Sequence, residues 1–189
     1  MTGVHLVPAQ HLDLNILRRL ADDLATLFPG PVDIVRNALN LSPFYSDDRG
    51  QYNSTRILLH MKERFHAVPY SAGIHHCYLA VCEEDLFTPI LTFVFGEAEF
   101  KGQVAIISCH RLRPERYGLA PDPGHLAERL LKEAVHELCH CFGLVHCRHQ
   151  WCVMRSSSDA EQIDLKRATL CDGCRATLSK TGMNLHPTS

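Results

Sequence analysis

The 189-residue chain has few aromatic residues (7%), a formal charge of only −2, and no long apolar run. A transmembrane helix needs ~18–20 consecutive apolar residues, so we expect none. Nineteen basic residues against 21 acidic ones give no electrostatic reason to expect nucleic acid or an anionic membrane as a partner. The first residues, MTGVHLVPAQHLDL, contain neither the basic nor the apolar part of a signal peptide. We therefore expect a cytoplasmic protein.

Internal repeats and low-complexity tracts are also missing, whereas apolar residues make up 46% of the chain. This composition excludes wholesale disorder and allows a packed core. A chain of 189 residues suits one domain of ordinary size, or a domain with a small appendage.

The spacing of apolar residues divides the chain into helices and strands. Leu12, Ile16 and Leu20 are four residues apart, which is typical of an amphipathic helix. The patterns predict helices over 10–28, 56–65 and 123–142, and strands within 31–40, 75–82, 90–100 and 103–112. This order, followed by a cysteine-rich tail, predicts an α/β fold in which helices pack on a mixed sheet.

Cysteine and histidine are abundant, with nine and thirteen residues. Six of the nine cysteines lie between Cys139 and Cys174, whereas a disulfide scaffold would spread its bridges over the chain. In a reducing cytoplasm, cysteines are metal ligands or buried thiols more often than disulfides. The clustering therefore favours metal binding.

A first metal site is predicted on the long third helix, for which Asp122 is the expected N-cap. His136 and His140 are four residues apart, so they share one helix face and can bind one zinc ion. Gly143 can reverse the chain after the helix, which would bring His146 back as the third ligand. Apolar residues occupy the opposite arc, so we expect the histidines to face a cleft.

Three histidine ligands leave the fourth position of zinc for water, which is the catalytic arrangement. Glu137, beside the first histidine, would take a proton from this water and pass it to the leaving amine. The alternative interpretation is a set of solvated surface histidines, which explains neither Gly143 nor His146.

A second metal site is predicted from two cysteine pairs. Cys147 and Cys152 follow the third histidine, and Cys171 and Cys174 form a C-x-x-C pair. Four thiolates suit a closed, tetrahedral, structural zinc site. Two disulfides or free thiols are the alternatives. We expect the other five cysteines to be buried small apolar residues.

Taken together, these motifs resemble the archaemetzincins, a family of the metzincin clan of zinc metallopeptidases. The family pattern joins H-E-x-x-H-x-x-G-x-x-H to an immediate cysteine, C-x4-C, C-x-M and a later C-x-x-C. This pattern runs here from His136 to Cys174 and includes Met154. Weaker resemblance extends upstream, so that it covers most of the chain.

The resemblance implies an upper subdomain (1–143), with a twisted sheet, a backing helix and an active-site helix, above a small zinc-stapled lower subdomain (144–189). It assigns Met154 to a tight turn, the Met-turn, beneath the catalytic zinc. It also implies that an edge strand binds an extended peptide as an added antiparallel strand. The residues that would form this edge are Thr92, Phe93, Val94, Phe95 and Gly96.

We therefore expect a peptidase with two zinc ions, one catalytic and one structural, that acts on peptides or unfolded protein segments. A monomer is the default oligomeric state. One alternative is a zinc amidohydrolase that acts on a small substrate. The other is a non-catalytic zinc-binding module that binds protein partners, although such a module would need no base beside the metal.

Overall fold

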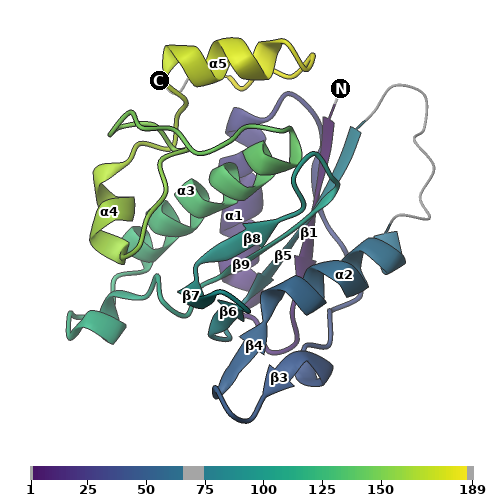
Figure 1. The fold of residues 1–189 in the computed structure, drawn as a ribbon, viewed down its shortest axis with the longest axis vertical. Coiled ribbons are helices and arrows are strands. Elements are labelled where there is room, and N and C mark those ends of the chain that lie inside the picture. Colours follow the sequence, from purple (N-terminus) through teal and green to yellow (C-terminus); the bar gives the residue numbers. More distant parts are fainter. Residues whose placement is uncertain (1, 66–74, 187–189) are drawn as a thin grey trace.

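A five-stranded sheet lies at the centre of the computed structural model, which describes residues 2–65 and 75–186 (Figure 1). Strand β1 pairs in parallel with β2 and β5, β5 pairs in parallel with β9, and the edge strand β8 runs antiparallel to β9. The spatial order is β2 (Val32–Ile34), β1 (Thr2–Pro8), β5 (His75–Cys82), β9 (Val104–Ser108) and β8 (Gly96–Ala98).

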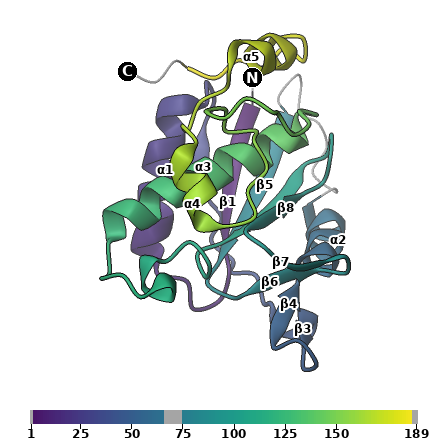
Figure 2. The same ribbon diagram turned by 60° about the vertical axis from the view of Figure 1, so that its left-hand side comes forward.

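Helices cover both faces of this sheet, because successive strand residues point to opposite sides. Helices α1 (Leu14–Leu27) and α3 (Pro123–Cys141) pack on one face, against side chains such as Leu6, Leu79 and Ile107. Helix α2 (Ser54–Phe65) packs on the other face. Figure 2 shows these three layers from the side. The α/β fold class is therefore confirmed.

Capping residues explain where the helices begin. The carboxylate of Asp122 accepts a hydrogen bond from the backbone N–H of His125, and Pro123 occupies the first helical position, as the sequence predicts. Asn53 accepts a hydrogen bond from the N–H of Arg56 at the start of α2. None of the helices in the described part of the chain is long and apolar enough to cross a membrane.

A smaller four-stranded sheet adjoins the main sheet near the start of α2. Its strands, in spatial order, are β3 (Tyr45–Ser46), β4 (Gln51–Asn53), β6 (Leu86–Thr88) and β7 (Leu91–Val94). A 3-10 helix, η1 (Ser42–Phe44), precedes β3. Strand β7 is an edge of this sheet and forms a hairpin with β6.

The sequence patterns missed four strands, β1, β3, β4 and β6, and merged two others into one. No strand was predicted over residues 2–8, which form the strand between β2 and β5. The predicted strand 90–100 is two strands in two sheets, separated at Phe95. The carbonyl of Phe95 accepts a hydrogen bond from the N–H of Ser108, so the chain leaves one sheet here and joins the other.

The C-terminal part adds a 3-10 helix before α3, η2 (Pro114–Tyr117), and two short helices after it, α4 (Ala160–Leu165) and α5 (Asp172–Ser179). Arg129, on α3, is 3% exposed and donates two hydrogen bonds to the carboxylate of Asp164, on α4. The same guanidinium donates to the carbonyl of Leu112. This contact fixes α4 against the long helix.

Candidate metal centres and cleft

Three histidines converge at the C-terminal end of α3. His136 and His140 lie one turn apart on the helix, and His146 follows it. Each ring offers one nitrogen atom as a metal ligand, and these three nitrogen atoms lie within 4.8 Å of one another. The structure therefore brings together the three predicted ligands of the first metal site.

Hydrogen bonds fix the tautomers of two of these rings. Nδ1 of His136 lies 2.8 Å from the carbonyl oxygen of Val153, and Nδ1 of His140 lies 2.7 Å from that of Leu144. A carbonyl oxygen can only accept, so each Nδ1 carries the proton and each Nε2 presents a lone pair. Burial, aided by the charge of Lys166, lowers the pKa of His136 well below its ordinary value and keeps the ring neutral.

The two Nε2 atoms lie only 3.1 Å apart. Two lone pairs at this distance cannot form a hydrogen bond with each other, so this arrangement calls for a cation between the rings. Neutral imidazoles whose other nitrogen donates to a backbone carbonyl are the usual ligands of zinc. The donor set therefore fits a zinc ion.

Gly143 produces the chain reversal that the sequence predicts. Its φ is +87°, a left-handed conformation that favours glycine. The N–H of Leu144 donates to the carbonyl of Cys139, which closes the end of α3. The same reversal supplies the Leu144 carbonyl that orients His140, so one turn both delivers His146 and positions a second ligand.

Glu137 lies beside the histidines and is 5% exposed. Burial, and after it the carboxylate of Glu133, raises the pKa of Glu137 well above its usual range. Such a carboxyl group holds a proton more readily than a solvent-exposed one, which suits a group that accepts a proton and then returns it.

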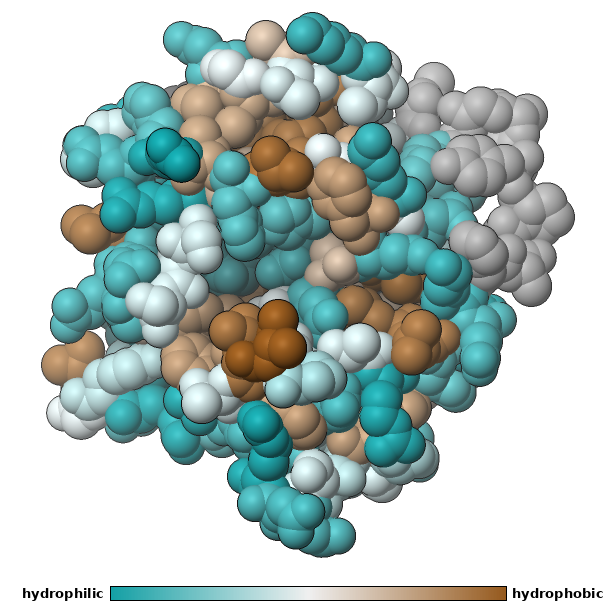
Figure 3. Space-filling model, in the orientation of Figure 1, coloured by the Kyte–Doolittle hydropathy of each residue, from teal (hydrophilic) through white to brown (hydrophobic). Residues whose placement is uncertain are grey.

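A cavity of about 310 Å³ opens over the histidine site. Residues 91–96 form one wall, and His136, Glu137 and His146 lie on its floor. The prediction that the helix histidines face a cleft is therefore correct for His136, whereas His140 is not among the residues that line this cavity. His136 is only 5% exposed, and its ring contacts the carbonyl oxygen of Val153, in the segment after His146. Figure 3 shows hydrophobic residues gathered at the β6–β7 hairpin, where Ile90 is 89% exposed.

A second cavity, of about 290 Å³, lies between α1 and the first turns of α3. It is lined by neither histidine nor cysteine, so it offers a metal none of the predicted ligands.

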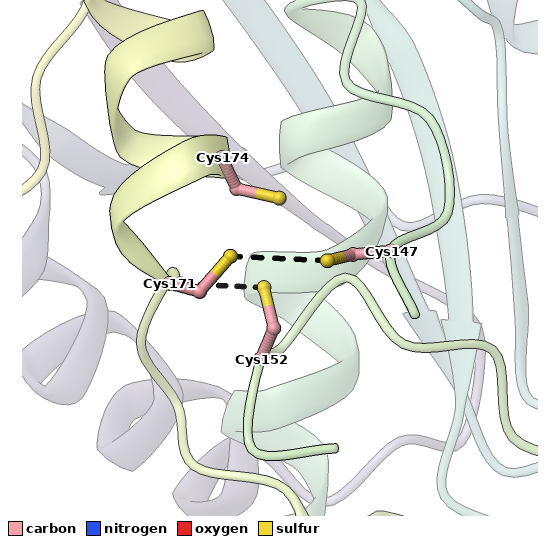
Figure 4. A group of neighbouring side chains, drawn as sticks. All are labelled: Cys147, Cys152, Cys171 and Cys174. Carbon is pink, nitrogen blue, oxygen red and sulfur yellow. Dashed lines mark hydrogen bonds between the residues drawn. The ribbon is translucent and has the colours of Figure 1, made fainter. Parts of the chain in front are cut away.

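The four predicted cysteines form a second centre beside α3. Cys147 and Cys152 come from the segment after the helix, and Cys171 and Cys174 from the start of α5; all four point toward one another (Figure 4). The sulfur atoms of Cys147 and Cys171 lie 3.8 Å apart. Tetrahedral zinc with bonds of about 2.3 Å places its sulfurs about 3.8 Å apart, whereas a disulfide bond is about 2.0 Å long.

Backbone groups support thiolates at this centre. The N–H of His149 donates to the sulfur of Cys147, and that of Cys171 to the sulfur of Cys152. Although burial raises the pKa of Cys171, the backbone N–H of Cys174 and the neighbouring thiols lower it overall, whereas burial raises the pKa values of Cys152 and Cys174. A bound cation would favour the deprotonated form of all four. A thiolate is the form of cysteine that binds metal, so this donor set also fits zinc.

The structure also places the remaining residues that the sequence analysis named. Met154 is fully buried, and its carbonyl accepts a hydrogen bond from the N–H of Cys147. The five other cysteines are buried, as expected: Cys77, Cys82, Cys109, Cys139 and Cys141. The predicted substrate edge, Thr92–Gly96, spans β7, Phe95 and the first residue of β8, and it borders the cavity.

Sequence reasoning missed Glu133 and Lys166 in the cavity wall, and also the three serines that line it, Ser156, Ser157 and Ser158. Glu133 lies four residues before Glu137 on α3, so the shared helix face was a signal that could have found it. Lys166 lies in a polar stretch with no motif of its own, and only the fold brings it to the cavity.

Comparison with known proteins agrees with this geometry. Residues 58–180 match the model of Peptidase family M54. The archaemetzincin of Methanocaldococcus jannaschii is 42% identical over 139 residues, which are 74% of this chain and 72% of that protein. The archaemetzincin of Pyrococcus horikoshii is 36% identical over 154 residues, or 78% of each chain.

Solved structures give the same result. The zinc-dependent peptidase from Methanocorpusculum labreanum superposes with a TM-score of 0.83 at 30% identity, covering 93% of this chain and 100% of that one. The archaemetzincin from Archaeoglobus fulgidus, complexed with malonate, gives a TM-score of 0.76 at 32% identity, covering 93% of this chain and 99% of that one.

Proposed function

The chain belongs to Peptidase family M54, the archaemetzincins, and is therefore a zinc-dependent metallopeptidase; we propose that His136, His140 and His146 hold its catalytic zinc and that Glu137 is its general base. This assignment rests on one observation: the Nε2 atoms of His136 and His140, each with a lone pair on a neutral ring, lie 3.1 Å apart. A partly buried pair of this kind would be unfavourable without a cation between the two nitrogens.

Zinc, when bound by the three histidines, would lower the pKa of a coordinated water to about 7 and polarise the carbonyl of the scissile bond. The carboxylate of Glu137 would accept a proton from the attacking water and return it to the leaving amine. Its burial supports this role, because the surrounding apolar groups favour the protonated carboxyl between the two transfers.

A second zinc at Cys147, Cys152, Cys171 and Cys174 would be structural. Four thiolates close the coordination sphere and leave no position for a substrate. The site would attach α5 to the segment that carries His146, in addition to the apolar contacts that residues of the lower subdomain, 144–189, such as Val153, Ile163 and Leu178, make within the main core. The expected upper subdomain, residues 1–143, contains the five-stranded sheet and α3.

The substrate would be an extended peptide or an unfolded protein segment. Strand β7 is an edge of the smaller sheet, so its backbone can pair with an added strand. Thr92–Gly96 lies along the cavity wall, which would place such a strand across the histidine site. A monomer in the cytoplasm remains our prediction.

The test combines metal analysis with one substitution. We expect about two zinc ions per wild-type chain. Glu137→Ala should retain both ions and lose hydrolysis of a broad peptide library, because it removes the base but no ligand. Equal turnover by the two proteins would refute the role of Glu137. A content near one zinc would show that one of the two centres is wrongly assigned.

A further inference from the structure

A buried ion pair stands in the cavity wall beside the proposed catalytic residues. Nζ of Lys166 lies 3.0 Å from Oε1 of Glu133, and the two side chains are only 1% and 5% exposed. Both line the cavity that contains His136 and Glu137. The proposed mechanism uses neither of them.

Stability alone gives a weak reason for such a pair. Removing two charges from water costs roughly as much as their attraction returns, and well-packed apolar residues often serve equally well. Glu133 lies one helical turn from both His136 and Glu137. The position of the ion pair in the cavity wall, beside these two residues, suggests that the pair contacts the ligand in the cavity.

Lys166 has hydrogen-bonding capacity to spare. An ammonium group has three N–H donors, and two are used by Oε1 of Glu133 and the carbonyl of Arg155, at 3.0 and 3.1 Å. The Glu133 carboxylate makes no other hydrogen bond within the described residues. Beyond their mutual hydrogen bond, Lys166 therefore keeps one N–H donor and Glu133 its second carboxylate oxygen as an acceptor, and the pair together carries no net charge.

Ser157 adds a second donor to the same cavity. Its hydroxyl is buried and has no hydrogen-bond partner among residues 2–65 and 75–186. A buried hydroxyl without a partner is unfavourable, and a bound ligand that accepts its hydrogen bond would relieve this cost.

We propose that this cavity selects a substrate side chain that ends in a primary carboxamide, that of glutamine or asparagine, next to the scissile bond. The carbonyl oxygen of the amide would accept from Lys166 and Ser157, and its NH₂ group would donate to Glu133. The inference rests on the proposed function, because the backbone of this substrate must lie across the histidine site.

Other side chains complement the wall less well. An apolar side chain would cover Ser157 and the lysine donor without pairing them, and a site built for hydrogen bonds rejects such analogues strongly. A carboxylate would approach the charge of Glu133, and an ammonium group would approach that of Lys166. The carboxamide offers both an acceptor and a donor without a net charge.

The test uses two peptide hydroxamates that differ in one side chain, 2-carbamoylethyl (glutamine-like) or isobutyl (leucine-like). Their dissociation constants are measured by titration calorimetry with the zinc-loaded full chain. We expect the wild type to prefer the glutamine-like compound at least about tenfold. Ser157→Ala should reduce this preference several-fold. The matched control is Ser158→Ala: Ser158 lines the same cavity, but its hydroxyl already donates to Asp159 and accepts from Gln162, so this variant should keep the wild-type preference.

A double variant, Glu133→Leu with Lys166→Met, replaces the ion pair by apolar residues of similar size, so that no unpaired charge is left buried. We expect it to bind the leucine-like compound at least as tightly as the glutamine-like one. Equal affinity of the two compounds for the wild type would overturn the inference and leave the zinc site intact. Failure of the zinc-loaded wild type to bind either compound would refute the proposed function and the inference with it.

Discussion

Glycine at position 96 determines how closely the main sheet approaches Glu137. A Cβ atom added to Gly96 would lie 2.8 Å from Cγ and 2.9 Å from Oε1 of Glu137, and 2.8 Å from the carbonyl oxygen of Ile106. Non-bonded carbon atoms normally stay about 3.5–4.0 Å apart. We therefore expect Gly96→Ala to displace the Glu137 carboxylate or strand β8 by about 1 Å.

A displacement of about 1 Å at a reacting group can cost about 100-fold in rate. We expect Gly96→Ala to lower kcat/KM by about this factor, mainly through kcat, while zinc content stays at the wild-type value. Overpacking should also lower the free energy of unfolding by about 1–3 kcal/mol. The assay is hydrolysis of the best peptide from the library, alongside zinc analysis and chemical denaturation.

Gly173→Ala is the matched control, because a Cβ at Gly173 meets nothing within 4 Å. It should keep wild-type kinetics. If Gly96→Ala retained wild-type kcat/KM with full zinc content, the close approach between β8 and Glu137 would not govern catalysis, and the reasoning from this geometry would be wrong.

Three further predictions concern stability. Cys171→Ser should reduce zinc content from about two ions to about one and lower the melting temperature. Activity per bound catalytic zinc should be affected only secondarily. An unchanged melting temperature would rule out the structural role of this centre. A strong chelator should likewise lower the melting temperature of the wild type, and added zinc should restore it. Asp164→Ala should cost about 2 kcal/mol at neutral pH, because it leaves the buried Arg129 guanidinium without its carboxylate. Although burial raises it, hydrogen bonds from Arg129 and His125 hold the pKa of Asp164 below its ordinary 3.8. This stabilisation is thus fully present above about pH 3.8 and is lost as the pH falls through the folded-state value, so denaturation curves of the two proteins should converge only in acid.

The candidate ligands could be predicted from the sequence because they depend on short-range geometry. The helical period places His136 and His140 on one face, and a single glycine returns His146 to them. Paired cysteines at short spacing limit the possible donor sets in the same way. The start of α3 was also predictable, since its cap Asp122 acts within three residues, whereas α1 begins at Leu14, after its cap Asp13, and not at the predicted residue 10.

Features that depend on distant parts of the chain were not predictable. A parallel strand buried on both faces usually shows a continuous apolar run, but Gly3 and His5 interrupt the run in β1. The break at Phe95 depends on pairing with Ser108, in another strand. Lys166 reaches the cavity because α4 packs on α3, through contacts such as Arg129 with Asp164.

The segment between His146 and Met154 connects the two candidate metal centres. His146 belongs to one donor set, and its neighbour Cys147 belongs to the other. The carbonyl of Val153 holds the proton of His136 on Nδ1, and Val153 follows Cys152 directly. The carbonyl of Met154 then accepts from the N–H of Cys147, which closes the segment into a loop. Because the cysteine centre fixes both ends of this loop, loss of its metal should loosen a histidine ligand and the carbonyl that orients another. The proposed structural centre would therefore act on catalysis through the positions of His146 and His136, without itself lining the cavity.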